Sequence, residues 1–148
     1  LMAMLDLVAL ATVADVAPLI GVNRAFVRQG LKVMARRVRP GLVALSDVAR
    51  LNRAPDCYHL GYVFGPRINA GGRIGAADLG ARLLSTLDMA EAEVLAKRLD
   101  SLNQDRRTIE AQVRDEALAQ AQTRGLDTPL KRAAGTRWRR GYRCAAIN

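Results

Sequence analysis

The longest regular pattern in the chain covers residues 90–123 and predicts one long helix. The apolar residues that recur there at helical spacings are Val94, Leu95, Leu102, Ile109, Val113 and Leu118. Charged residues fill most of the remaining positions, Asp88 is a suitable N-cap, and Gly125 is a natural stop. Such a helix extends about 50 Å, which is long for one small core. The pattern fits either a connector between two lobes or a bundle helix with a solvated charged face.

The rest of the chain also has mainly helical patterns, so the expected fold class is mainly α. Shorter helices are predicted at 5–13, 24–37, 42–52 and 77–85, and 57–64 is predicted as a helix or a strand. Asn23 is the expected N-cap of the second helix, in which Phe26, Leu31 and Met34 share a face. Pro18 and Gly21 separate the first two helices.

The net charge of +9 favours a polyanionic partner, but most of it comes from the C-terminal stretch. Residues 131–148 contain six Lys or Arg and no acidic residue. Cys57 and Cys144 are far apart, without a CxxC motif or a histidine cluster, so neither a zinc site nor a disulfide framework is expected. Because no apolar run is long enough to span a membrane and no signal peptide is recognisable, a reducing cytoplasm is the default location.

The segment Gly65–Gly75, GPRINAGGRIG, combines two arginines with an amide and several glycines. Glycine permits positive φ or close approach of a ligand to the backbone, and arginine presents a planar fork to phosphate oxygens. We therefore expect a loop in which Arg67, Asn69 and Arg73 clamp a nucleic-acid backbone. The alternative is a structural turn with two solvated arginines.

This segment resembles the GPRINAAGRxG motif of the RecJ family, the single-strand-specific 5′→3′ DNA exonucleases of the DHH phosphoesterase superfamily. Residues 7–34, 39–45 and 99–113 also resemble RecJ stretches in the same order, so the similarity covers roughly residues 5–130. The resemblance implies that the chain is an internal fragment. Residues 1–75 would form the helical end of an α/β DHH catalytic domain, 76–126 a helical inter-domain connector, and 127–148 the start of the DHH-associated domain.

The resemblance also implies a reaction and its site residues. Members of the family hydrolyse phosphodiesters of single-stranded DNA with two metal ions, Mn²⁺ or Mg²⁺, in recombination and repair. Asp15 matches the last metal-binding aspartate, whereas without the resemblance it would be interpreted as a cap or turn residue. Arg67, Asn69 and Arg73 match the loop that faces the DNA. Because the other metal-binding motifs are missing, we expect the chain alone to be inactive.

Other polar residues are interpreted as structural. His59, in an apolar segment, is more typical of a packing residue than of a catalytic one, and Asp47, Asp56 and Asp78 are interpreted as cap or turn residues. Aromatic residues are scarce, at 4%, so broad base stacking is not expected.

The C-terminal residues depart from the RecJ pattern. The segment Trp138–Cys144 could be encoded by codons that, shifted by one base, read Gly-Val-Val-Gly-Ile-Val, which resembles the missing family motif. We therefore hypothesise a frameshift upstream of Trp138, which would leave a tail with little buried surface. The alternative is a genuine basic arm that binds nucleic acid.

Two other functions fit parts of the sequence. One is a different DHH phosphoesterase that acts on short oligonucleotides or small phosphoanhydrides. The other is a non-enzymatic helical nucleic-acid binder, with residues 24–52 as a helix-turn-helix. The apolar start of the second helix, Leu42 and Val43, argues for core packing instead.

Overall fold

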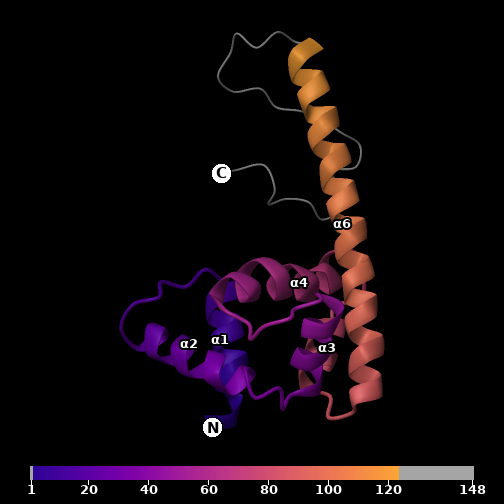
Figure 1. The fold of residues 1–148 in the computed structure, drawn as a ribbon. Helices are drawn as coiled ribbons and strands as arrows, with labels where there is room; N and C mark the ends of the chain where they lie inside the picture. Colours follow the sequence, from indigo (N-terminus) through magenta and orange to yellow (C-terminus); the bar gives the residue numbers. More distant parts are fainter. Residues whose placement is uncertain (1, 124–148) are drawn as a thin grey trace. The chain divides into compact units, whose positions relative to one another are not determined.

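The computed structural model describes residues 2–123, and every regular element in that part of the chain is helical (Figure 1). The elements in order are η1 (Met2–Met4), α1 (Leu5–Ala14), α2 (Gly21–Met34), α3 (Pro40–Val48), η2 (His59–Phe64), α4 (Gly65–Ile74), α5 (Leu79–Ser85) and α6 (Met89–Thr123). The short η1 is a 3-10 turn and η2 is π-helical. The prediction of a mainly helical segment is confirmed.

Helices α1 and α2 pack side by side at a glycine (Figure 1). A Cβ atom at Gly30 would lie 2.1 Å from the carbonyl oxygen of Leu5 and 2.5 Å from the Cβ of Ala9. Only a residue without a side chain lets the two backbones approach this closely. The buried face of α2 consists of Val27, Gly30 and Met34. The prediction that Phe26 shares this face is wrong, because Phe26 is 42% exposed.

The start of α2 also differs from the prediction. The helix begins at Gly21, which has a φ of 51°, and Ile20 occupies the N-cap position without a side-chain hydrogen bond. Asn23 lies within the first turn, where its side-chain amide donates a hydrogen bond of 3.1 Å to the carbonyl of Pro18. Asn23 therefore holds the preceding connection and does not cap the helix.

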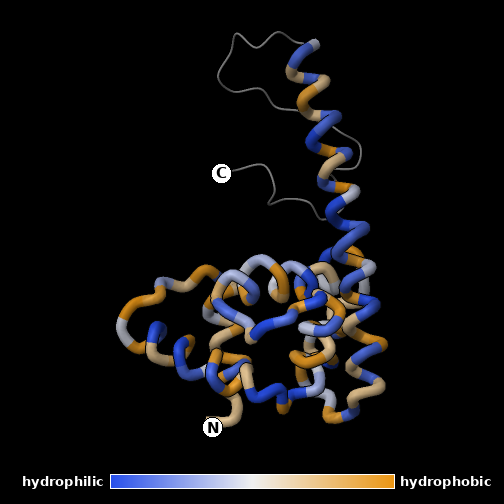
Figure 2. Tube along the Cα trace, in the orientation of Figure 1, coloured by the Kyte–Doolittle hydropathy of each residue, from blue (hydrophilic) through white to orange (hydrophobic). Residues whose placement is uncertain are grey.

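That connection, between α1 and α2, is apolar and exposed. Figure 2 shows hydrophobic colouring along much of it. Val16 is 86% exposed and Ile20 is 73% exposed, and Val22, in the adjoining first turn of α2, is 61% exposed. Val16 also has a φ of 57°, which is uncommon for a β-branched residue. Exposed apolar surface of this kind is typical of contact sites.

Helix α3 belongs to the core. Leu42, Ala44 and Leu45 are buried, and a Cβ at Gly41 would lie 2.0 Å from the carbonyl oxygen of Leu83 in α5. The fully buried large side chains are Phe64, Leu45, Leu60, Leu83, Leu99 and Asn103. Because the first turns of α3 are covered, this helix cannot present its start to DNA bases as a helix-turn-helix protein does.

Helix α6 begins as predicted. The backbone N–H of Ala90 donates to Asp88 Oδ1 at 2.9 Å, which confirms Asp88 as the cap. The buried residues of α6 are Ala92, Leu95, Ala96, Leu99, Leu102 and Asn103. Two of the apolar residues that recur at helical spacings, Val94 and Leu118, are exposed. Two alanines and an asparagine form part of the packed face.

The contacts within the chain define a compact unit that ends at Asn103, and the part of α6 from Gln104 belongs to a second unit. The predicted divisions after residues 75 and 126 remain predictions. No helix in the described range is long and apolar enough to cross a membrane. The hypotheses about the C-terminal tail concern residues outside those that the structure describes.

Candidate nucleic-acid interface

The segment around the predicted phosphate clamp is helical, so the prediction of a loop is wrong. Residues 57–74 form one continuous helical stretch, with α-helix at its start, the π-helical η2 in its middle and then α4. The glycines of α4 have ordinary negative φ values, since Gly21 is the one glycine with positive φ in the described chain. Positive φ, one of the two roles expected of the glycines, is therefore not what they supply, and Gly65, Gly71 and Gly75 instead lie at close packing contacts.

A reciprocal hydrogen-bond pair starts this stretch. The N–H of His59 donates to Asp56 Oδ1 at 3.1 Å, and the N–H of Asp56 donates to His59 Nδ1 at 3.1 Å. This is the geometry of a capping box, with histidine in the place usually taken by glutamate or glutamine. The backbone hydrogen bond from His59 is the main cause that lowers the pKa of Asp56 below its usual 3.8. The interpretations of Asp56 as a cap and of His59 as a buried packing residue are confirmed.

The wider π-helical turn leads into the proline of α4. The N–H of Gly65 donates to the carbonyl of Leu60, five residues earlier, and Pro66 follows in the first turn of α4. Proline has no N–H and crowds the preceding turn, so it is tolerated best where a helix begins or its hydrogen bonding shifts. The π turn therefore lets Pro66 lie inside a continuous helical stretch.

Glycines hold the inner face of α4 against the core. A Cβ at Gly71 would lie 3.0 Å from Leu99 Cδ2, and one at Gly75 would lie 2.6 Å from Leu102 Cδ1. At the other end of α4, a Cβ at Gly65 would lie 3.3 Å from the Cβ of Ala14. These contacts set α4 closely between α6 and the end of α1.

Arg67 binds within the protein. Its Nε donates to Asp100 Oδ1 at 2.9 Å, and its Nη1 donates to the carbonyl of Val63 at 2.9 Å. The two charged side chains are 14% and 19% exposed. A partly buried, hydrogen-bonded ion pair of this kind fixes α4 to α6. That Arg67 contacts phosphate remains a prediction.

The other two predicted residues lie together on the outer face of α4. Asn69 and Arg73 are exposed and four positions apart, so they are neighbours on one side of the helix. Gly72 lies between them, and a Cβ there would meet no atom within 4 Å. An open helical glycine costs about 1 kcal/mol relative to alanine. Packing against α6 explains why a glycine occupies position 71. It does not explain the glycine at position 72.

The predicted metal ligand lies at the end of α1. Asp15 is exposed and occupies the C-cap, where its N–H donates to the carbonyl of Ala11 at 3.0 Å. It directly follows Ala14, the residue that faces Gly65 at the start of α4. No group of three or more possible metal ligands occurs among the described residues. Asp15 could therefore supply one hard oxygen donor, and it cannot hold a metal ion by itself.

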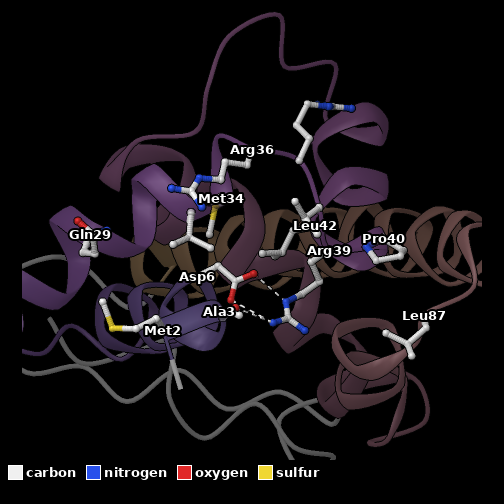
Figure 3. Close-up of a pocket in the computed structure, with 13 residues that line it drawn as sticks. Met2, Ala3, Asp6, Gln29, Met34, Arg36, Arg39, Pro40, Leu42 and Leu87 are labelled. Carbon is white, nitrogen blue, oxygen red and sulfur yellow. Dashed lines mark hydrogen bonds and ion pairs between the residues drawn. The ribbon is translucent and has the colours of Figure 1, made fainter.

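One arrangement was missed by reasoning from the sequence. Asp6 and Arg39 form a largely buried ion pair, with Arg39 Nε 2.7 Å from Asp6 Oδ2 and Arg39 Nη2 3.1 Å from Asp6 Oδ1 (Figure 3). The same guanidinium donates to the carbonyls of Ala3 and Leu84. The pair lines a cavity of about 680 Å³. The only sign of this ion pair in the sequence was Asp6, an acidic residue in an otherwise apolar helix.

Comparison with known proteins shows where this helical arrangement occurs. No protein-family model matches the chain. The chain is 47% identical over 117 residues to the single-stranded-DNA-specific exonuclease RecJ of Dickeya dadantii, and 45% identical over 117 residues to that of Escherichia coli. Each match covers 78% of this chain and 20% of the relative. The crystal structure of RecJ from Thermus thermophilus in complex with Mn²⁺ aligns with a TM-score of 0.71 and 39% identity, over 77% of this chain and 17% of that one.

Sequence and fold thus agree that the chain matches a helical segment of RecJ proteins. The chain belongs to the RecJ family, and it spans about a fifth of the length of the curated relatives that it matches.

Proposed function

We propose that this chain is the part of a RecJ-type 5′→3′ exonuclease that contacts the backbone of single-stranded DNA. The observation that carries the proposal is the outer face of α4, where Asn69, Gly72 and Arg73 are exposed side by side. An amide and a guanidinium can donate to phosphate oxygens, and Gly72 allows a strand to approach the backbone. The similarity to exonucleases that act on single-stranded DNA supports the same ligand.

The proposal gives the predicted residues different tasks. Arg73 and Asn69 contact phosphate, whereas Arg67 positions α4 through its ion pair with Asp100. Asp15 contributes one carboxylate to a site for Mn²⁺ or Mg²⁺, the ions present in solved RecJ structures. Such ions activate water and stabilise charge on the phosphate during hydrolysis. The remaining ligands would come from parts of a RecJ-type protein that this chain does not contain, and a cytoplasmic location is part of the same proposal.

The phosphate contact can be tested by the salt dependence of binding. Affinity of the chain for single-stranded DNA is measured across a range of salt concentrations, for the parent chain, Arg73→Ala and the control Arg28→Ala. Arg28 is an exposed arginine of α2, so its removal changes the net charge equally. Loss of one phosphate contact should reduce the salt slope by about 0.7 for Arg73→Ala. Equal slopes for the two variants would contradict the proposal.

The catalytic part can be tested in a graft. The matching segment of Thermus thermophilus RecJ is replaced by this chain's residues, and Mn²⁺-dependent degradation of a single strand is measured. We expect activity in the graft and strong loss on Asp15→Ala, with an unchanged melting temperature as the check on folding. An active Asp15→Ala graft would show that Asp15 is not a metal ligand.

A further inference from the structure

Two tyrosines form an exposed stacked pair beside the proposed interface. The ring centroids of Tyr58 and Tyr62 are 5.1 Å apart, with an angle of 30° between the planes. Tyr58 is 63% exposed and Tyr62 is 68% exposed. Each ring directs one face toward the other, and these exposures leave much of both rings in water. The sequence predicted little base stacking because aromatics are few, but the fold brings two of the three tyrosines together.

The tyrosines continue the outer face of α4. Within the helical stretch 57–74, the exposed positions are Tyr58, Tyr62, Asn69, Gly72 and Arg73. Tyr58 and Tyr62 are four positions apart, as are Asn69 and Arg73, and the buried Leu60, Phe64 and Ala70 lie among these exposed positions. The exposed row of this helical stretch therefore has the aromatic pair toward its start and the proposed phosphate contacts toward its end, about 20 Å along the axis from Tyr58 to Arg73.

The chemistry of this row favours an unpaired nucleic-acid strand. Proteins that bind single strands combine cationic groups along the backbone with aromatic rings on which successive bases stack. Here the rings lie at one end of the row and the guanidinium at the other, and the open Gly72 lies next to the guanidinium. A duplex could offer phosphates to Arg73, but its bases are stacked inside the helix and cannot reach the tyrosines.

We infer that Tyr58 and Tyr62 form a platform that stacks unpaired nucleobases of the strand whose phosphates contact Arg73. The inference rests on the proposed function and adds a reason why this segment would prefer single strands. It assigns the two tyrosines a role in binding bases of any sequence, because every base has a face that can stack.

The experiment compares two ligands that differ only in their bases. Binding of a short oligothymidylate and of an abasic phosphodiester strand of equal length is measured for the 148-residue chain and its variants. We expect the double variant Tyr58→Ala/Tyr62→Ala to bind oligothymidylate about tenfold more weakly and the abasic strand as before. The double variant Tyr58→Phe/Tyr62→Phe keeps the rings and should keep the affinity. The control Phe26→Ala removes an exposed aromatic residue of α2 and should change neither affinity.

The outcomes separate this inference from the proposed function. Arg73→Ala should weaken binding of both ligands, since phosphates are common to both. If Arg73→Ala changes neither affinity, the proposed function fails, whereas an unchanged oligothymidylate affinity in the double alanine variant overturns the platform alone. Equal losses for both ligands in that variant would also overturn it, because they would show a contact that does not involve bases. Melting temperatures of the Tyr58 and Tyr62 variants should match the parent chain, because both replaced rings are exposed.

Discussion

Asp6 and Arg39 show how one charged pair can set the position of several helices. Asp6 lies in the first turn of α1, and Arg39 directly precedes α3. The guanidinium also donates to the carbonyl of Leu84 in α5. With side-chain exposures of 4% for Asp6 and 19% for Arg39, the two charges satisfy one another largely away from water. Removing one partner of such a pair leaves an uncompensated charge, which is the costly change.

We expect Asp6→Leu to lower the free energy of unfolding by about 3 kcal/mol. The double variant Asp6→Leu/Arg39→Met should recover much of this loss, because it removes both charges and keeps apolar volume. Denaturant unfolding of the parent chain, Asp6→Leu, Arg39→Met and the double variant measures both effects. If the double variant were as unstable as the sum of the single variants, the ion pair would not be the source of the loss.

Asp56 provides a prediction for pH. Its pKa is lowered, mainly by the hydrogen bond from the His59 backbone, so the folded protein favours the carboxylate more than the unfolded chain does. The resulting stability is fully present above the usual pKa of 3.8 and is lost as the pH falls through the lowered pKa. Asp56→Asn should keep the cap at neutral pH, since asparagine caps about equally well. Thermal unfolding across acidic pH should then show a weaker pH dependence for this variant, and an identical pH profile would contradict the assignment.

Among the elements, close helix contacts depend on particular glycines. Gly30 lies where α1 and α2 touch, whereas Gly72 lies on an open face of α4. Both are helical glycines, so the cost of glycine to the helix itself is the same at the two positions. The difference in surroundings therefore predicts opposite effects of the same substitution.

Gly30→Ala should destabilise the protein by about 3 kcal/mol, because its Cβ would collide with the Leu5 carbonyl and force the two helices apart. Gly72→Ala should stabilise it by about 1 kcal/mol, as the new methyl group meets nothing. Denaturant unfolding of the two variants gives the comparison. The proposed function adds that Gly72→Ala should weaken DNA binding despite the gain in stability. Destabilisation by Gly72→Ala would mean that its surroundings are more crowded than the structure shows.

At the scale of the whole molecule, the chain covers only a small part of the RecJ proteins that it matches. This limits the reactions that we expect the chain to catalyse by itself. The chain spans about a fifth of the RecJ proteins that it matches, and its described residues contain no group of three metal ligands. We therefore expect the purified chain to release no mononucleotides from a single strand in the presence of Mn²⁺, while it still binds the strand. The measurement is nuclease activity next to binding on the same preparation. Metal-dependent release that persists in Asp15→Ala would overturn the assignment of Asp15.

Much of the helical order follows from the sequence alone. The signals used were the apolar spacings, the cap Asp88 and the breaking residues Pro18 and Gly21. Each acts over one or two helical turns, so it can be recognised without knowledge of the fold. The motif around Arg73 and its resemblance to RecJ likewise depend only on the order of residues. These local signals predicted the helices and the family, and they indicated the segment in which we propose the interface.

Tertiary structure decided how the same residues are used. Whether Arg67 meets solvent or Asp100, and whether Gly72 or Gly71 is open, depends on α6, which lies about thirty residues further along the chain. The pairing of Asp6 with Arg39 is also a contact between distant parts of the sequence. The predicted loop at Gly65–Gly75 is largely the helix α4, which continues the π-helical η2, so that the exposed Tyr62 and Arg73 belong to one helical stretch. Helical periodicity indicates on which face of a helix a residue lies. Only packing against the other helices determines whether that face is covered or left open to a ligand.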